Sequence, residues 1–221
     1  MKLKHHHYAI VAYVLSIAAG LLYSLWFLGY IYNPKAMDTL AVSALQTVGQ
    51  PHYELFVAGD VATGLIVVLL VVCLVRLFQR TKQHKEINFY LCMIGLLAFG
   101  VMTAVSCLYP SCDSNSSYCV QNVSQVFDVH NVTGTIASLG QFMSVVTALI
   151  LFHKKVSKTV NWTVLTLLIL WAISGIIFIS LSTASQSASL FMQHLFLVLS
   201  SILLVDVTWL LIKSNPSQVN N

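Results

Sequence analysis

Six long runs of apolar residues decide what this chain can fold into. They cover approximately residues 8–32, 53–77, 87–108, 128–152, 162–183 and 189–212. Each run reaches the roughly 20 apolar residues that a helix needs to cross about 30 Å of hydrocarbon, and none has the alternation that is typical of a barrel strand. The sequence therefore predicts an all-α, polytopic integral membrane protein in which all 221 residues form one domain, a bundle of six transmembrane helices.

Composition and charge placement support a membrane location. The chain is 57% hydrophobic and 8% charged, whereas soluble domains carry about 25% charged residues. The basic residues sit in short clusters between the apolar runs, and no basic stripe is interleaved with aromatic residues. This pattern argues against nucleic-acid binding and makes membrane lipid the expected partner.

The lysines and arginines also predict the orientation, because they are enriched in cytoplasmic connections. Only Lys35 falls on one side of the predicted bundle. The other basic residues all fall on the opposite side, before the first run, in the second and fourth connections, or at the end of the sixth run: Lys2, Lys4, Arg76, Arg80, Lys82, Lys85, Lys154, Lys155, Lys158 and Lys213. We therefore predict a multi-pass protein of the cell membrane with both termini cytoplasmic.

Two outer connections are long enough to carry structure of their own. The first, at about residues 33–52, contains MDTLAVSALQTV between Pro34 and Gly49, and this stretch is predicted to form a short helix at the membrane interface. The second is the polar loop YPSCDSNSSYCVQNVSQ at 109–125.

The cysteines of the second loop predict a disulfide. Thiols outside the cell tend to be oxidised, and Cys112 and Cys119 both lie in the loop, with Cys107 just before it. A bond between Cys112 and Cys119 is the first expectation, and one between Cys107 and Cys119 is the alternative. A zinc–thiolate site among the three is a less favoured third possibility.

Three ionisable residues share the outer third of the predicted membrane. Asp60, His130 and His194 lie about seven, two and five residues inside the second, fourth and sixth runs, all of which enter from the outer side. At 1.5 Å per residue their depths span only about 8 Å. Each such group costs about 2.5–3.5 kcal/mol on insertion scales, so a shared depth predicts an outward-facing polar pocket.

Helical periodicity extends this pocket along the helices. On the fourth run His130, Thr133, Gly134, Ala137, Gln141 and Ser144 recur at spacings of three and four, which places them on one face. The predicted ligand-binding residues are Asp60, Thr63, His130, Gln141 and His194, with Asp128 and Asn131 at the rim. The structural alternative is that small and polar residues pack membrane helices together, and this is the favoured interpretation for Gly134, Ala137, Ser138 and Gly140.

Asp206 has a different setting from the outer residues. It lies near the inner end of the sixth run, about seven residues before Lys213. We expect a structural ion pair with Arg76 of the second run, or with Lys213 itself. A proton or cation path through Asp206 is the functional alternative.

One region of the chain is similar to a known family. The stretch MDTLAVSALQTVGQPHYELFVAGDVATGLIVVLL, followed by YP, the polar loop and HNVTGTIASLGQF, resembles the six-helix membrane proteins called domain of unknown function 998. The resemblance covers roughly residues 36–150 and implies a fold and a membrane location, but no activity. The matching positions are Ser43, Gly49, Phe56, Gly59, Gly64, Pro110, His130, Asn131 and Gly134.

Three classes of function remain open. The first and favoured class is binding or transport of a small polar ligand, a cation or a lipid headgroup in the outer polar pocket. Against full transport, the runs lack the paired Gly/Pro-broken segments of inverted-repeat carriers, and proline is absent from all six interiors.

The second class is a membrane-embedded, metal-dependent hydrolase that acts on a lipid. Two histidines and an aspartate can hold a catalytic zinc with one open position. Asp60, His130 and His194 are the candidate ligands, with Asp128 or Glu54 as the general base. The third class is a membrane scaffold that binds a partner protein through its helices or its outer loop.

Overall fold

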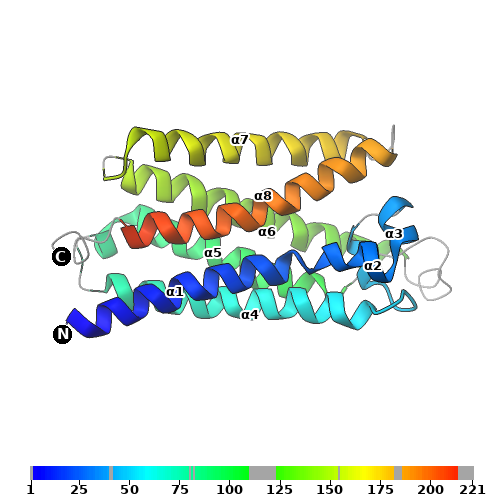
Figure 1. Cartoon of the computed structure of the whole chain (residues 1–221), viewed down its shortest axis with the longest axis horizontal. Coiled ribbons are helices and arrows are strands. Elements are labelled where there is room, and N and C mark those ends of the chain that lie inside the picture. The colour runs from blue at the N-terminus through cyan, green and yellow to red at the C-terminus, as the bar shows by residue number, and fades with distance from the viewer. Residues whose placement is uncertain are drawn as a thin grey trace.

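The computed structural model describes residues 2–39, 42–79, 81, 83–109, 123–153, 155–181 and 186–213, and these form an all-helical bundle (Figure 1). The long helices are α1 (Lys2–Tyr23), α4 (Tyr53–Phe78), α5 (Ile87–Ser106), α6 (Val123–Phe152), α7 (Lys158–Leu181) and α8 (Gln186–Lys213). The short elements are η1 (Leu25–Leu28), α2 (Gly29–Tyr32), α3 (Pro34–Thr39), η2 (Val42–Gln46) and η3 (Gln83–Lys85).

The six predicted membrane spans are confirmed by helices that are long and apolar enough to cross a bilayer. Within the described residues these spans are His6–Tyr32, Tyr53–Phe78, Ile87–Ser106, Val129–Phe152, Lys158–Leu181 and Ala188–Lys213. α1 begins and α8 ends at the same end of the bundle (Figure 1). Which side of the membrane that end faces stays a prediction from the positive-inside rule. Below, "inner" and "outer" refer to that predicted orientation.

The first span differs from the single helix expected over 8–32. α1 ends at Tyr23, and the chain continues through the 3₁₀ turn η1 into α2. The Ser24 amide donates to the carbonyls of Gly20 (3.2 Å) and Leu21 (3.1 Å), and its hydroxyl donates to the Gly20 carbonyl at 2.9 Å. A serine hydroxyl that bonds back to its own helix often bends it, and here the α-helix stops at this residue.

The bundle packs in a chain of helix pairs. α5 packs most closely against α6, α1 packs against α4 and α8, and α7 packs mainly on α8 at the edge of the bundle (Figure 1). Fully buried phenylalanines join three helices at one end, with the ring of Phe78 centred 5.2 Å from Phe89 and 6.2 Å from Phe152. The exposed isoleucines of α7 point away from the core, where lipid would cover them.

Glycines allow the closest helix contacts. A Cβ added at Gly140 of α6 would lie 2.7 Å from the carbonyl oxygen of Gly95 on α5, and α4 meets α5 in the same way at Gly64 and Gly100. This is the packing role expected for Gly140, because small residues let membrane helices approach. At Gly134 no described residue places an atom within 4 Å of an added Cβ, so the described helices do not give this glycine the expected packing role.

The first outer connection folds back onto the bundle instead of lying as one interfacial helix. We call the described residues 29–39 and 42–50 the outer cap. It contains α2, α3 and η2, and its side chains Met37 and Leu45 pack with Trp26 and Phe56 in a small apolar cluster. Gly29 packs closely here, and a Cβ added at this position would lie 2.6 Å from the Met37 sulfur, so that side chain would have to shift.

The glycine contacts generate a matched stability test on one helix. We expect Gly140→Ala to lower the free energy of unfolding by about 1–3 kcal/mol, because the new methyl collides with α5 backbone. Gly134→Ala has open space and removes a flexible residue from a helix, so it should be neutral or stabilising by up to about 1 kcal/mol. Equilibrium unfolding in mixed detergent micelles measures the free energy of unfolding of both variants. Equal changes in the two variants would contradict the close contact between Gly140 and α5.

Candidate functional site

Asp60 is bonded to the outer cap. Its carboxylate oxygen Oδ2 accepts a hydrogen bond from the Gln46 side-chain amide of η2 at 2.6 Å, and the residue is only partly exposed. The Cys107 thiol lies close by, and its pKa is raised by burial and, to a smaller extent, by the negative charge of Asp60. Thr63 lies one turn along α4, and its hydroxyl donates a hydrogen bond to the Gly59 carbonyl at 2.9 Å. Asp60 therefore serves as an anchor for the connection above it.

His194 of α8 belongs to an aromatic group at the outer end of α1. Its Nδ1 lies 3.1 Å from the Tyr30 hydroxyl, and its ring stacks on Trp26 with centroids 4.7 Å apart. Phe27 stacks on the same indole at 3.9 Å. Trp26 Nε1 and His194 Nε2 are both buried, and no described residue makes a hydrogen bond to either nitrogen.

The predicted ligand-binding residues of α6 lie apart from one another and have different neighbours. His130 Nδ1 lies 3.2 Å from the Ser106 carbonyl and 3.0 Å from the Tyr109 carbonyl, so this histidine caps the end of α5. Gln141 donates to the Ser200 carbonyl at 2.6 Å and ties α6 to α8. Asn131 is exposed. The Asp128 side chain lies outside the described residues, and its rim position stays a prediction.

The predicted metal ligands do not form one site. Asp60 is engaged by Gln46, His194 by Tyr30 and Trp26, and His130 by carbonyls at the end of α5. Among the residues that the structure describes, no group of three or more His, Cys, Asp or Glu side chains is placed to hold a metal ion. Their shared depth in the membrane stays a prediction, and packing directs the three side chains to different neighbours.

The predicted disulfide falls on residues that the structure does not describe. Cys112 and Cys119 both lie in that part of the outer loop, so their pairing stays a prediction. Cys107 is described, and it is a buried free thiol that donates to the Thr103 carbonyl at 3.3 Å. The alternative bond between Cys107 and Cys119 is therefore not formed in this structure.

Asp206 lies on the wall of a cavity between α1 and α8. The expected partner Arg76 is exposed on α4, and no described residue makes a hydrogen bond or an ion pair with Asp206. The structure thus gives Asp206 a different neighbourhood from the predicted ion pair: the helix that carries it packs on α1 and α7 rather than against α4.

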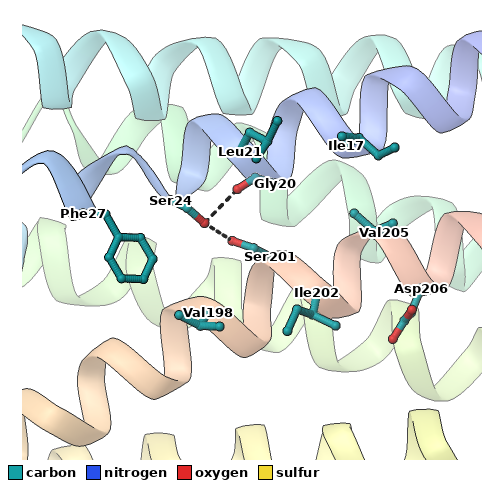
Figure 2. Close-up of a pocket in the computed structure, with 10 residues that line it drawn as sticks. All are labelled: Ile17, Gly20, Leu21, Ser24, Phe27, Val198, Ser201, Ile202, Val205 and Asp206. Atoms are coloured by element: carbon teal, nitrogen blue, oxygen red, sulfur yellow. Dashed lines mark hydrogen bonds between the residues drawn. The ribbon is translucent and has the colours of Figure 1, made fainter.

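The cavity is a groove of about 360 Å³ (Figure 2). Phe27 lies at its outer end and Asp206 at its inner end, with the Ser24 and Ser201 hydroxyls 2.9 Å apart between them. The described residues that line it are Ile17, Gly20, Leu21, Ser24, Phe27, Val198, Ser201, Ile202, Val205 and Asp206. Leu21 is 68% exposed and Ile202 is 41% exposed, so the mouth of the groove opens on the lipid-facing surface of the bundle.

Local sequence explains why a groove forms at this place. Gly20 brings α1 close to α8, since an added Cβ would lie 3.3 Å from the Ser201 carbonyl. Beyond this contact α1 stops at Tyr23, and η1 takes the chain off the helical path. The groove could not be found from the sequence, because its lining comes from two helices at opposite ends of the chain.

The bond between Gln46 and Asp60 can be tested by a double-mutant cycle. With Gln46→Ala, Asp60→Ala and the double variant, we expect a coupling of about 1.5–3 kcal/mol in unfolding free energy, because the acceptor is a carboxylate. Asp38, an exposed acid of α3, supplies the control: Asp38→Ala combined with Gln46→Ala should show no coupling. A coupling below about 0.5 kcal/mol for the Asp60 pair would mean that Asp60 does not hold the outer cap.

Comparisons with known proteins agree with the family resemblance of residues 36–150 and extend it along the chain. Residues 16–210 match the family described as a protein of unknown function, DUF998. A search of curated proteins and a search of solved structures each found no match. The matched region begins within α1 and ends within α8, so it includes residues of all six spans. The chain is a six-span membrane protein that belongs to the DUF998 family.

Proposed function

We propose that this protein binds an amphiphilic small molecule, which enters the groove between α1 and α8 sideways from the lipid. The observation that carries the proposal is the cavity of about 360 Å³ with its mouth on the lipid-facing surface. Ligand pockets in proteins have volumes of about 300–1,000 Å³ and a mostly apolar lining with a few placed polar groups. The groove fits that description in both size and lining.

The lining suits a molecule that has an apolar chain and a polar head. Ile17, Leu21, Val198, Ile202 and Val205 form the apolar wall. The polar atoms belong to Ser24 and Ser201, whose hydroxyls meet, and to Asp206, which lies apart from them at the inner end of the groove (Figure 2). A purely apolar lipid tail would leave Asp206 without a partner, and a purely polar solute would have no route through the hydrocarbon to the mouth.

Binding remains the favoured class, but we move the proposed site. The outer residues Asp60 and His130 are engaged in holding the cap and the end of α5, so they offer less to a ligand than the groove does. The hydrolase alternative depended on these residues and His194 acting together, and their separate partners weaken its support. The proposal covers binding alone, without transport.

Photolabelling tests the proposed site directly. A dodecyl alcohol that carries a diazirine on its chain is added to the protein in phosphatidylcholine nanodiscs, and labelled residues are mapped by mass spectrometry. We expect several-fold more label on Leu21 and Ile202 than on Ile176. Ile176 is 65% exposed on α7 and lies outside the groove, on the lipid-facing surface.

Two matched tryptophan variants complete this test. Ile202→Trp fills the groove and should reduce the label on Leu21 about tenfold, which corresponds to a loss of about 1.4 kcal/mol of binding free energy. Ile176→Trp makes the same change on the lipid-facing side of α7 and should leave the label on Leu21 unchanged. Labelling in proportion to exposure alone, with no effect of Ile202→Trp, would refute the site.

A further inference from the structure

We propose that the groove selects cationic amphiphiles, and that Asp206 receives the N–H groups of a protonated long-chain amine, while the serine pair farther along the groove offers only acceptors. This inference rests on the proposed function, because it assigns the chemical class of the ligand that the groove would bind. It follows from three observations: the hydrogen-bonding capacity of the lining, the free state of Asp206, and its depth in the bundle.

The described lining of the groove offers hydrogen-bond acceptors and no free donor. Each serine hydroxyl has one proton. Ser24 lies within hydrogen-bond distance of the Gly20 carbonyl (2.9 Å), Ser201 within that of the Leu197 carbonyl (3.2 Å), and the two hydroxyls of each other (2.9 Å). Both protons are thus used inside the protein, and lone pairs are what remains for a ligand. The other lining side chains are apolar except for Asp206, which is itself an acceptor when ionised.

A carboxylate in a membrane needs a basic partner, and Asp206 has none among the residues that the structure describes. No described residue pairs with it or donates to it. A carboxylate removed from water is costly unless it is paired and hydrogen-bonded. A ligand that brings a positive charge and N–H donors supplies both requirements, whereas a phosphate, sulfate or carboxylate headgroup would be repelled.

The position of Asp206 favours an amine on a chain over a bare metal ion. It precedes Lys213 by seven residues on α8, which places it about 10 Å from the inner end of the helix. A metal ion there would have one carboxylate, since the described residues hold no cluster of His, Cys, Asp or Glu around it. A primary ammonium has three donors, and its alkyl chain can lie along the apolar wall toward Phe27 (Figure 2).

Competition against the photolabel tests the class of ligand. The competitors share a dodecyl chain and differ in the head: dodecylamine, dodecyltrimethylammonium, dodecanol and dodecyl sulfate. We expect dodecylamine to protect Leu21 and Ile202 at concentrations at least tenfold lower than dodecanol. Dodecyltrimethylammonium has the charge but no N–H, so it should fall between them. Dodecyl sulfate should protect most weakly.

Asp206→Asn removes the charge at nearly constant shape and should abolish the preference for dodecylamine while leaving protection by dodecanol unchanged. Glu86→Gln is the matched control, because it makes the same type of change at an exposed position on the same end of the bundle as Asp206, and it should preserve the preference. Comparing variants in the same bilayer cancels the partitioning of each competitor into lipid.

The possible outcomes separate the two proposals. Equal protection by dodecylamine and dodecanol, with both lost in Ile202→Trp, would overturn the amine inference and leave the groove as a binding site. A preference for dodecylamine that survives Asp206→Asn would also overturn it. Absence of any groove-specific label would refute the proposed function itself.

Discussion

The absence of water inside a bilayer is the constraint on which this structure depends. A polar group that crosses the hydrocarbon must find its partner within the protein, because lipid chains offer none. Most of the serines and threonines in the spans meet this condition locally. Thr147 and Thr208, for example, bond to carbonyls one turn earlier on their own helices at 2.7 Å and 3.1 Å.

Longer polar side chains meet the same condition between helices and so determine the packing. Ser200 accepts two hydrogen bonds from other helices. Its carbonyl accepts one from Gln141 of α6 at 2.6 Å, and its hydroxyl accepts one from the Trp171 indole of α7 at 2.7 Å. One position of α8 thereby connects the helix to two neighbours. The bond from Gln46 to Asp60 does the same for the outer cap. Asp206 has no such partner among the described residues, which is why we propose that a ligand binds beside it.

The number and extent of the spans could be predicted from the sequence, because the length of an apolar run is a local property that the bilayer thickness fixes. The positions of Asp60, His130 and His194 along their runs could likewise be counted from the sequence, but their partners could not be predicted. Gln46 reaches Asp60 because the outer cap folds inward, and Tyr30 reaches His194 because α1 ends early. Neither event is encoded in helical periodicity. The groove depends on Gly20 and Ser201 meeting across nearly the whole length of the chain.

The most direct test of lateral entry is the accessibility of a spin label in the groove. A nitroxide is attached at Ile202→Cys in a chain whose five native cysteines are replaced, and at Ile176→Cys on α7 for comparison. Collision rates are then measured with lipid-dissolved oxygen and with a water-soluble nickel chelate. Entry from the lipid predicts that oxygen reaches both labels, that the chelate reaches neither, and that dodecylamine reduces the oxygen collisions at position 202 alone. Ready access of the nickel chelate to position 202 would show a water-filled pocket and contradict the account.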